Sequence, residues 1–160
     1  MSLLTGYVVG DEALQASFHR LPNDFQGALK TGVGRACLLV QKLTKEALSG
    51  YVLNVKTGRL RRSINTRIDE KPMSVQGIVG TNVQYAGVHE FGFQGVVPVR
   101  EHLRKTVNGG QATVRAHNRS VDMPERSFLR SSLHRLQPEI RREIETAINA
   151  QLARVMGGRA

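Results

Sequence analysis

The longest regular pattern in the chain is a run of apolar residues at steps of three and four, the spacing of one face of an α-helix. In residues 25–48 this pattern comprises Phe25, Leu29, Val33, Ala36, Val40, Leu43 and Ala47. Asn23 and Gln26 have the spacing of a capping box at its start, and Ser49-Gly50 follows as a stop signal. The sequence therefore predicts a long N-terminal helix over residues 25–48.

Three glycines, Gly27, Gly32 and Gly34, lie inside this predicted helix. Each weakens a helix by up to about 1 kcal/mol relative to alanine, unless close packing against another element requires a small residue. A shorter helix, at about residues 12–21, is expected to precede the long one.

A second helical pattern comprises Leu129, Leu133, Leu136, Ile140, Ile144, Ile148, Leu152 and Val155. Pro138 interrupts it, and proline is tolerated at the start of a helix but not in its interior. The pattern therefore predicts a short helix over residues 128–136 and a longer C-terminal helix from Pro138, which Gly157-Gly158 ends.

Between the two helical regions the period changes from three or four to two, which is typical of strands. Ile64, Thr66 and Ile68 alternate with polar residues, and Lys71-Pro72-Met73 then turns the chain. Residues 74–81 make a plausible antiparallel return, and residues 85–91 have the pattern of a short helix that Gly92 closes.

Two extended runs in residues 96–121 flank Asn108-Gly109-Gly110, the most turn-prone tripeptide in the chain. They predict a long β-hairpin arm over about residues 94–122. If Gly109-Gly110 is the loop, the pairs that face each other are Arg104 with Arg115, Arg100 with Arg119, and His102 with His117. Like charges directly opposite one another destabilise a strand pair, so this register favours an anionic partner.

These elements predict an α+β fold in which long N-terminal and C-terminal helices pack on a small antiparallel sheet, with the long hairpin projecting from it. Neither a repeat nor a linker divides the sequence, so we expect one domain over residues 1–160.

The chain is strongly basic, with 23 Lys and Arg against 13 acidic residues and a net charge of +10. Such an excess favours nucleic acid or an acidic protein surface as a partner. The start of the sequence lacks a signal-peptide pattern, and no apolar run approaches the roughly 20 residues of a membrane helix. We therefore expect a cytosolic or particle-borne protein with no membrane partner.

The sequence offers no convincing chemistry for an enzyme. The glycine-rich stretch GALKTGVGRA lies inside a predicted helix, His89-Glu90 lacks the second histidine of a zinc site, and His102 with His117 lacks a third ligand. Cys37 cannot form an internal disulfide and is expected to be a small, partly buried apolar residue. No catalytic residue, cofactor, metal or small-molecule substrate is predicted.

Four stretches occur in a characteristic order, namely TGRLRRSI at residues 57–64, VGTNVQYAGVHEFG at 79–92, VRAHNRSV at 114–121 and MPERSFLRSSL at 123–133. With this order and spacing, residues 25–155 resemble the Hong-Kong-97-like family of tailed-phage morphogenesis proteins. That family is related to the head-to-tail joining, tail-completion and minor tail proteins of other long-tailed phages. The chain departs from the family pattern in having Glu125, Ser127 and Ser131-Ser132 in the last stretch.

The resemblance implies a structural protein without catalysis, assembled as an oligomeric ring at the head-to-tail junction or the proximal end of the tail. Its implied partners are other copies of itself, neighbouring neck, connector or tail-tube proteins, and packaged DNA through non-specific contact. Its implied location is the host bacterial cytoplasm during assembly and the virion afterwards. The motif residues with a mainly structural role are Gly58, Leu60, Gly80, Asn82, Tyr85, Ala86, Glu90, Phe91, Gly92, Pro124, Phe128 and Leu129.

Two details of these motifs are open to test. Tyr85, Val88 and Phe91 are three residues apart and are expected to pack one helix face onto the core. Glu90 is expected to form an ion pair with Arg59 or Arg62 of the same chain or, equally, with an arginine of the next subunit.

The candidate interface lies on the hairpin and is made of Arg100, His102, Arg104, Arg115, His117 and Arg119. It would contact another subunit or DNA. The alternative function is a nucleic-acid-binding module that uses this basic face, since a two-stranded ribbon can enter a major groove.

Overall fold

The computed structural model describes residues 4–7, 24–72 and 74–157. The expected cap at Asn23 and the short helix expected at about residues 12–21 lie outside these residues. The described elements, in chain order, are β1 (Leu4–Tyr7), α2 (Asp24–Glu46), the π-helical turn η1 (Ala47–Tyr51), α3 (Arg59–Arg62), β2 (Asn65–Lys71), β3 (Ser74–Thr81), α4 (Ala86–Phe91), β4 (Phe93–Val99), β5 (His102–Lys105), β6 (Gln111–Val114), β7 (His117–Met123), α5 (Leu129–Arg135) and α6 (Gln137–Gly157).

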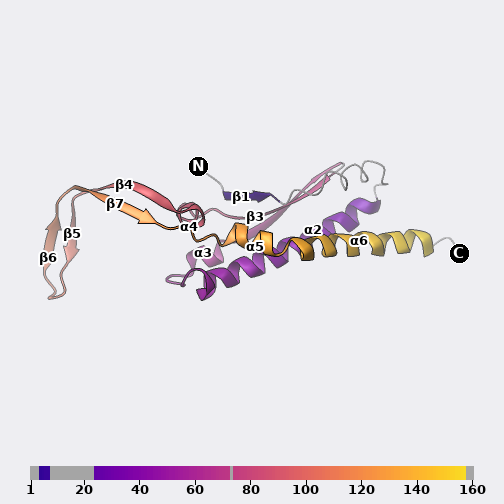
Figure 1. Ribbon diagram of the computed structural model, residues 1–160, viewed down its shortest axis with the longest axis horizontal. Coiled ribbons are helices and arrows are strands. Elements are labelled where there is room, and N and C mark those ends of the chain that lie inside the picture. Colours follow the sequence, from indigo (N-terminus) through magenta and orange to yellow (C-terminus); the bar gives the residue numbers. More distant parts are fainter. Residues whose placement is uncertain (1–3, 8–23, 73, 158–160) are drawn as a thin grey trace.

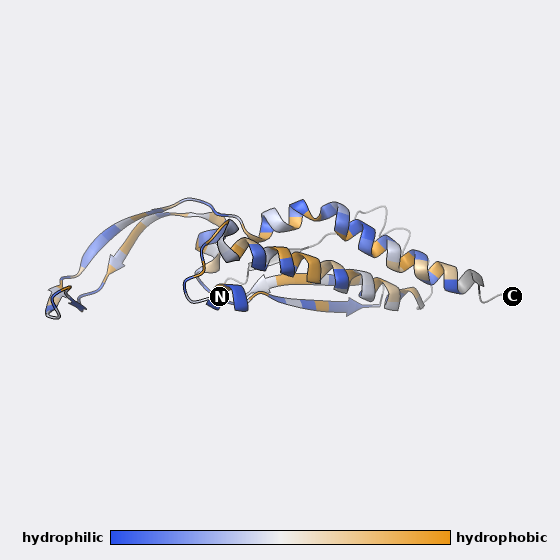
Figure 2. Ribbon diagram, turned by 90° about the horizontal axis from the view of Figure 1, so that it is seen from below, coloured by the Kyte–Doolittle hydropathy of each residue, from blue (hydrophilic) through white to orange (hydrophobic). Residues whose placement is uncertain are grey.

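The body of the molecule has three layers. An antiparallel sheet in the order β1-β3-β2 forms the first layer. Helix α2 lies along one face of this sheet, and α6 lies on the other side of α2 (Figure 2). The predicted α+β class is therefore confirmed, with α2 in direct contact with the sheet and α6 covering α2.

The core lies where α2, β3 and the start of α5 meet. Its most deeply buried apolar side chains include Val40 of α2, Ile64 before β2, and Phe128 and Leu129 at the start of α5. The same apolar repeat that predicted α2 therefore supplies one wall of the core.

Two glycines allow unusually close packing of the layers. A Cβ added at Gly77 of β3 would overlap Cys37 Sγ of α2 and come within 2.8 Å of Val33 Cγ1. A Cβ at Gly32 of α2 would lie 3.0 Å from the Cα of Ile144 in α6. The expectation that glycines in α2 permit close packing is confirmed at Gly32, whereas Gly27 has no neighbour within 4 Å among the described residues.

The boundaries of the helices follow local signals. Helix α2 continues into η1, which contains Gly50 at a φ of 120°, so the predicted stop at Ser49-Gly50 is confirmed. The Gln26 side chain donates to the carbonyl of Lys71 at the end of β2 (2.9 Å), while its expected capping-box partner, Asn23, lies outside the described residues. The predicted division near Pro138 is also confirmed, since α5 ends at Arg135 and α6 begins at Gln137.

The hairpin arm projects from one end of the body (Figure 1). Strand β4 pairs with β7, and further out β5 pairs with β6, in one continuous antiparallel register. The chain bends between the two strand pairs. The predicted long hairpin is thus present, with its strands beginning at Phe93 and ending at Met123.

The predicted register of the arm is wrong. The loop is Val107-Asn108-Gly109, with Gly109 at a φ of 79° and its N–H donating to the carbonyl of Thr106 (3.1 Å). A three-residue loop that ends in left-handed glycine shifts the pairing relative to the two-residue loop expected at Gly109-Gly110. Arg104 therefore lies opposite Ala112, and His102 opposite Val114.

Strand β1 is an element that the sequence did not predict. It pairs with β3 from Leu4 opposite Thr81 to Tyr7 opposite Ile78. Four residues with a glycine among them carry too weak an alternation to be recognised as a strand.

Within the described part of the chain, none of the helices combines the length and apolarity that crossing a bilayer requires.

Candidate functional site

All six residues of the candidate interface on the arm have exposed side chains. The observed register does not bring them together in pairs. Arg119 lies opposite Val97 and His117 opposite Val99, so each basic residue of β7 faces an aliphatic residue of β4. The expectation that Arg104 faces Arg115, Arg100 faces Arg119 and His102 faces His117 is therefore wrong.

The structure instead gives the two halves of the arm similar local geometry. His102 Nδ1 lies 3.0 Å from the carbonyl oxygen of Arg100, and His117 Nδ1 lies 2.9 Å from that of Arg115. Each histidine begins a strand directly beyond the bend. The four side chains are thus distributed around the bend, and Arg104 and Arg119 lie further along the strands.

One face of the inner arm is mainly apolar. Residues that lie opposite one another share a face, and odd-numbered positions of β4 and β7 form this one. We call it the apolar face of the arm. Its apolar members are Phe93, Val97, Val99, Val121 and Met123, and it also contains Gly95, His117 and Arg119. Because these side chains are partly or fully exposed in the single chain, the arm presents an apolar surface to solvent.

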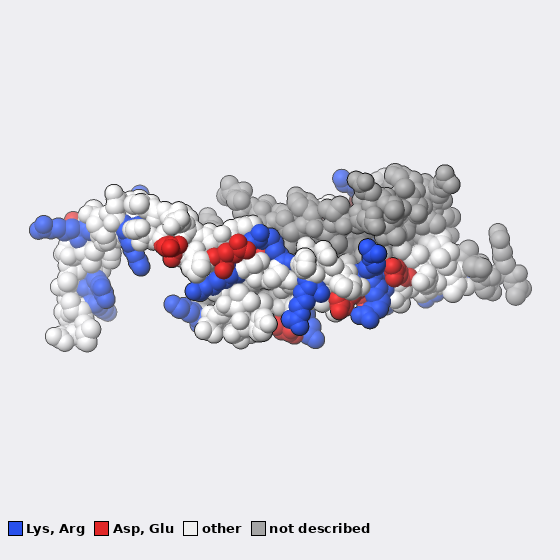
Figure 3. Space-filling model, in the orientation of Figure 1, with Lys and Arg blue, Asp and Glu red and all other residues white. Residues whose placement is uncertain are grey.

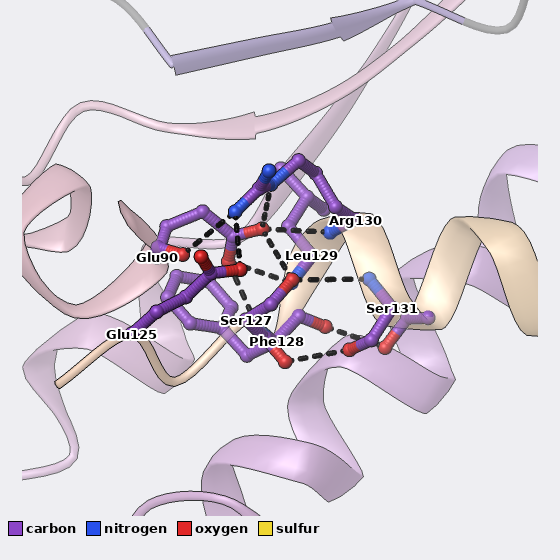
Figure 4. A network of polar contacts seen from close by, with 8 residues as sticks. Glu90, Glu125, Ser127, Phe128, Leu129, Arg130 and Ser131 are labelled. Atoms are coloured by element: carbon purple, nitrogen blue, oxygen red, sulfur yellow. Dashed lines mark hydrogen bonds and ion pairs between the residues drawn. The ribbon is translucent and has the colours of Figure 1, made fainter. Parts of the chain in front are cut away.

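The root of the arm is held by Glu90 of α4, whose side chain is 0% exposed (Figure 4). Its carboxylate accepts hydrogen bonds from the backbone N–H groups of Phe128 (2.9 Å), Leu129 (2.9 Å) and Arg130 (2.8 Å). These are the N–H groups that the first turn of a helix leaves without partners. Glu90 therefore caps α5 from another element, and the negative charge lies at the favourable end of the helix dipole.

Further contacts to the same carboxylate complete the arrangement. Ser127 Oγ donates to Glu90 at 3.0 Å, and Arg130 Nε lies 3.3 Å from it. The Arg130 guanidinium also donates to Glu125 (2.7 Å) and lies over the ring of Phe91, 4.5 Å from its centroid. The expectation that Glu90 receives Arg59 or Arg62 is wrong, because Arg130 is its partner within the chain and full burial leaves no access for another subunit's arginine.

The two chain segments at the root of the arm cross at Gly92. This residue has a φ of 73°, and a Cβ there would lie 2.8 Å from the carbonyl oxygen of Met123 and 2.9 Å from the backbone N of Glu125. Only glycine combines that backbone conformation with so close an approach. The family motif that ends in Glu90-Phe91-Gly92 thus connects α4, both arm strands and α5 at one place.

The burial of α4 differs from the expectation. Its buried residues are Ala86 and Glu90, whereas Tyr85 and Phe91 are exposed. Tyr85 contacts the ring of His89 edge-on at 6.0 Å between centroids. The face with Tyr85, Val88 and Phe91 is therefore not the core-packing face, because the capping role of Glu90 turns the opposite side of α4 inward.

The remaining motif residues have structural positions. Gly58 has a φ of 69° before α3, and Leu60 packs against the core. Gly80 lies in β3 between Thr5 and Asn65, while Asn82 and Pro124 are exposed connections. The burial of Phe128 and Leu129 confirms that they anchor the C-terminal helices.

The titratable groups with displaced pKa values show no catalytic arrangement. Burial raises the pKa of the Cys37 thiol, which keeps it protonated and unreactive. Burial, and then the nearby Arg126 guanidinium, lower the pKa of His89. Among the described residues, no three His, Cys, Asp or Glu side chains converge as metal ligands.

The sequence alone could not reveal the role of Glu90, since its partners lie about forty residues away and are mostly backbone groups. A weak signal was present. Helix α5 begins at Phe128, whose side chain cannot cap it, and Ser127 Oγ accepts only the N–H of Ser131 (3.3 Å) in the first turn.

Comparison with family models gave a match over residues 35–153 to the phage virion morphogenesis family. The match includes about half of α2, the body strands β2 and β3, the whole arm and most of α6. Comparisons with curated proteins and with solved structures gave no match. The resemblance carried by the four motifs is thereby confirmed, and the chain belongs to the phage virion morphogenesis family.

Proposed function

We propose that this protein is a structural subunit of a tailed phage or prophage that forms an oligomeric ring at the head-to-tail junction or the proximal end of the tail, where it serves tail completion or joining. The observation that carries the proposal is the projecting arm (Figure 1). A two-stranded ribbon is only marginally stable in water. Among the described residues no third strand pairs with β4 or β7, so a neighbouring subunit is the covering element that fits best.

Ring closure requires two different patches on each subunit that meet head to tail. The apolar face of the arm is one candidate patch, and the outer edge of β2 in the body sheet is a strand edge to which a neighbour could add. The contacts of Glu90 and Gly92 hold the arm at a defined angle, which supports a role in setting the geometry between neighbours.

In this proposal residues 1–160 act as one morphogenesis domain with no catalytic chemistry and no cofactor. Its partners are other copies of itself, neighbouring neck, connector or tail-tube proteins, and packaged DNA through non-specific contact. The subunit folds in the host bacterial cytoplasm and then becomes part of the neck or tail of the virion. Family membership supports the role in the virion, and the exposed arm supports contact with neighbouring subunits or proteins.

The alternative, a nucleic-acid-binding module on the arm, loses its main structural support. It depended on a face where basic residues lie opposite one another, and the observed register places aliphatic residues opposite His102, Arg104, His117 and Arg119. The net charge of +10 still favours weak, salt-sensitive contact with DNA.

The arm can be tested by charge reversal with Arg104→Glu and Arg115→Glu together. We expect a folded subunit that fails to complete particles when it is supplied to a phage lacking the gene, as counted by electron microscopy. The control is Arg141→Glu with Arg142→Glu, an equal charge change at exposed positions of α6. Normal particles from the arm variant would contradict the proposal. Duplex binding at micromolar or lower Kd, with a steep loss on raising salt, would favour the nucleic-acid module instead.

A further inference from the structure

A pocket of about 960 Å³ lies at the root of the arm and shares only Met123 with the apolar face described above. It is bounded by η1 and the connection to α3, by α3 and α4, and by the segment where the chain leaves β7. Its apolar lining residues are Leu48, Leu53, Val55, Leu60, Tyr85 and Met123. Val55 and Tyr85 are 46% and 41% exposed, so this apolar lining is open to solvent.

The polar lining of the pocket is basic. Five cationic side chains contribute to it, Lys56, Arg59, Arg61, Arg62 and Arg126, and no carboxylate of the described residues does. The ion pairs among the described residues involve Lys30, Arg67 and Arg130 instead. Charges of one sign gathered around a cleft with low-dielectric walls concentrate the electric field there.

Neutral groups hold two of these arginines in position. Arg61 donates to Ser49 Oγ and Arg62 to the carbonyl of Thr57, each at 3.1 Å. These hydrogen bonds orient the guanidinium groups and leave their charge uncompensated. Lys56, Arg59 and Arg126 make no side-chain hydrogen bond within the described part of the chain.

From this combination we propose that the pocket is a docking site for an acidic polypeptide segment of another virion protein, with an aliphatic or aromatic anchor residue flanked by Asp or Glu. The anchor would cover the exposed apolar lining, and the carboxylates would pair with Arg59, Arg126 and their neighbours. A ligand that fits the pocket must therefore carry both negative charge and an apolar group.

The apolar lining favours a polypeptide over nucleic acid. A phosphate backbone would use the cations but would leave Leu53, Val55 and Met123 uncovered or facing charge, which gains nothing from the hydrophobic effect. A peptide segment brings acidic and apolar side chains within a few residues of each other. Pockets of this size typically bind a ligand through mostly apolar walls, and a few polar groups fix its orientation.

This inference goes beyond the proposed ring, because the pocket would bind its segment in a single subunit. Met123 is the last residue of β7, Arg126 lies in the segment that follows it past Gly92, and His89 lies one residue from Glu90. An occupied pocket would therefore contact the same root that fixes the arm.

The test is selection of a random short-peptide library, displayed on a carrier, against the whole chain. We expect recovered sequences to place Asp and Glu beside a Leu, Phe, Ile or Trp. The variant Arg59→Ala with Arg126→Ala should weaken binding of a recovered, fluorescently labelled peptide at least about tenfold, the loss expected for two charge-assisted contacts. The matched control is Arg104→Ala with Arg115→Ala, which removes the same charge from the arm and should leave the peptide Kd within about twofold if the pocket alone binds it.

Apolar contact has its own pair of variants, Val55→Ser in the pocket and Val96→Ser on the arm. Only Val55→Ser should weaken binding of the peptide. Equal loss with both arginine pairs would mean general attraction to a basic protein and would overturn the proposal, as would recovered sequences without acids. Duplex DNA is tested as a competitor of the peptide for the pocket. If it displaces the peptide, and its own binding is lost in Arg59→Ala with Arg126→Ala, the pocket binds nucleic acid and the proposal is overturned. The arm variant Arg104→Glu with Arg115→Glu, which tests the ring, should still bind the peptide. The pocket can therefore be tested separately from the ring.

Discussion

Glu90 shows how one buried carboxylate can organise a region of this protein. Removing a carboxylate from water costs several kcal/mol, and it is stable only when hydrogen bonds and opposite charge replace the lost hydration. Here three backbone N–H groups, a hydroxyl and a guanidinium do so. The acid is therefore a structural group, and its value to function is that it fixes the root of the arm.

Glu90→Gln is predicted to lower the free energy of unfolding by about 2–3 kcal/mol. The amide keeps the size but loses the charge, and its NH₂ group cannot accept from the N–H groups of α5. Urea unfolding followed by circular dichroism measures the change. Glu125→Gln, in which only an exposed partner of Arg130 is altered, should change stability by no more than about 0.5 kcal/mol. Equal stability of the wild-type chain and Glu90→Gln would refute the capping role.

Gly77 and Gly27 provide opposite predictions for the same substitution. Gly77→Ala should destabilise the protein by about 1–3 kcal/mol, since its Cβ would overlap Cys37 and force α2 away from β3. Gly27→Ala should stabilise it by up to about 1 kcal/mol, because this exposed helical position has no described neighbour within 4 Å. Chemical unfolding of the two variants side by side tests the packing, and a neutral Gly77→Ala would contradict it.

His89 should make the protein less stable in mild acid. Burial first, and Arg126 second, lower its pKa in the folded chain, whereas the unfolded chain keeps the ordinary value of about 6.5. Above that pH the ring is neutral in both states and contributes nothing. As the pH falls through about 6.5, the unfolded state binds a proton that the folded state does not, so the free energy of unfolding decreases until the lowered pKa is reached.

The measurement is the pH dependence of unfolding for the wild-type chain and for His89→Gln, together with an NMR titration of the ring. We expect the variant to have a flatter profile in this window and Arg126→Gln to raise the pKa of His89. An unshifted titration in the wild-type protein would show that the ring is not desolvated as described.

The elements of this protein were predictable to different degrees. The spacing of apolar residues located α2, α5 and α6, because each must bury one side against a neighbour. Turn chemistry located the hairpin but not its register, since Asn108-Gly109-Gly110 suits either a two-residue or a three-residue loop. The inward face of α4 was assigned wrongly because a buried acid, Glu90, replaces the apolar residue that periodicity assumes.

Cross-linking can decide the register of the arm. Leu103→Cys with Thr113→Cys places two thiols at directly paired positions, whereas Leu103→Cys with Ala116→Cys pairs them only under the two-residue loop. Disulfides require Cα atoms about 4.4–6.8 Å apart, so a shift of three residues separates the two cases clearly. We expect the first pair to oxidise readily and the second to remain reduced, as measured by mass spectrometry after mild oxidation. Preferential oxidation of the second pair would restore the other register.

The described part of the molecule combines a layered body with a projecting arm, and Lys and Arg side chains lie along both (Figure 3). The body provides the core and the basic pocket, while the arm provides extended strands with free edges. Family membership establishes a role in virion morphogenesis. The position of the pocket beside the arm root means that two partners, one on each surface, would bind close together.

The proposed ring depends on which face of the arm a neighbour covers, and this predicts an asymmetric response to new charge. Val121→Asp adds a carboxylate to the apolar face, opposite Gly95, whereas Val96→Asp adds one to the other face of the same strands, opposite Ser120. A buried, unpaired carboxylate costs several kcal/mol, so the first variant should abolish particle completion while the second retains it. Electron microscopy of complemented lysates counts the particles, and circular dichroism checks that both subunits fold. If both variants assemble normally, the apolar face is not an interface; if only the second fails, the neighbour binds the other side of the arm.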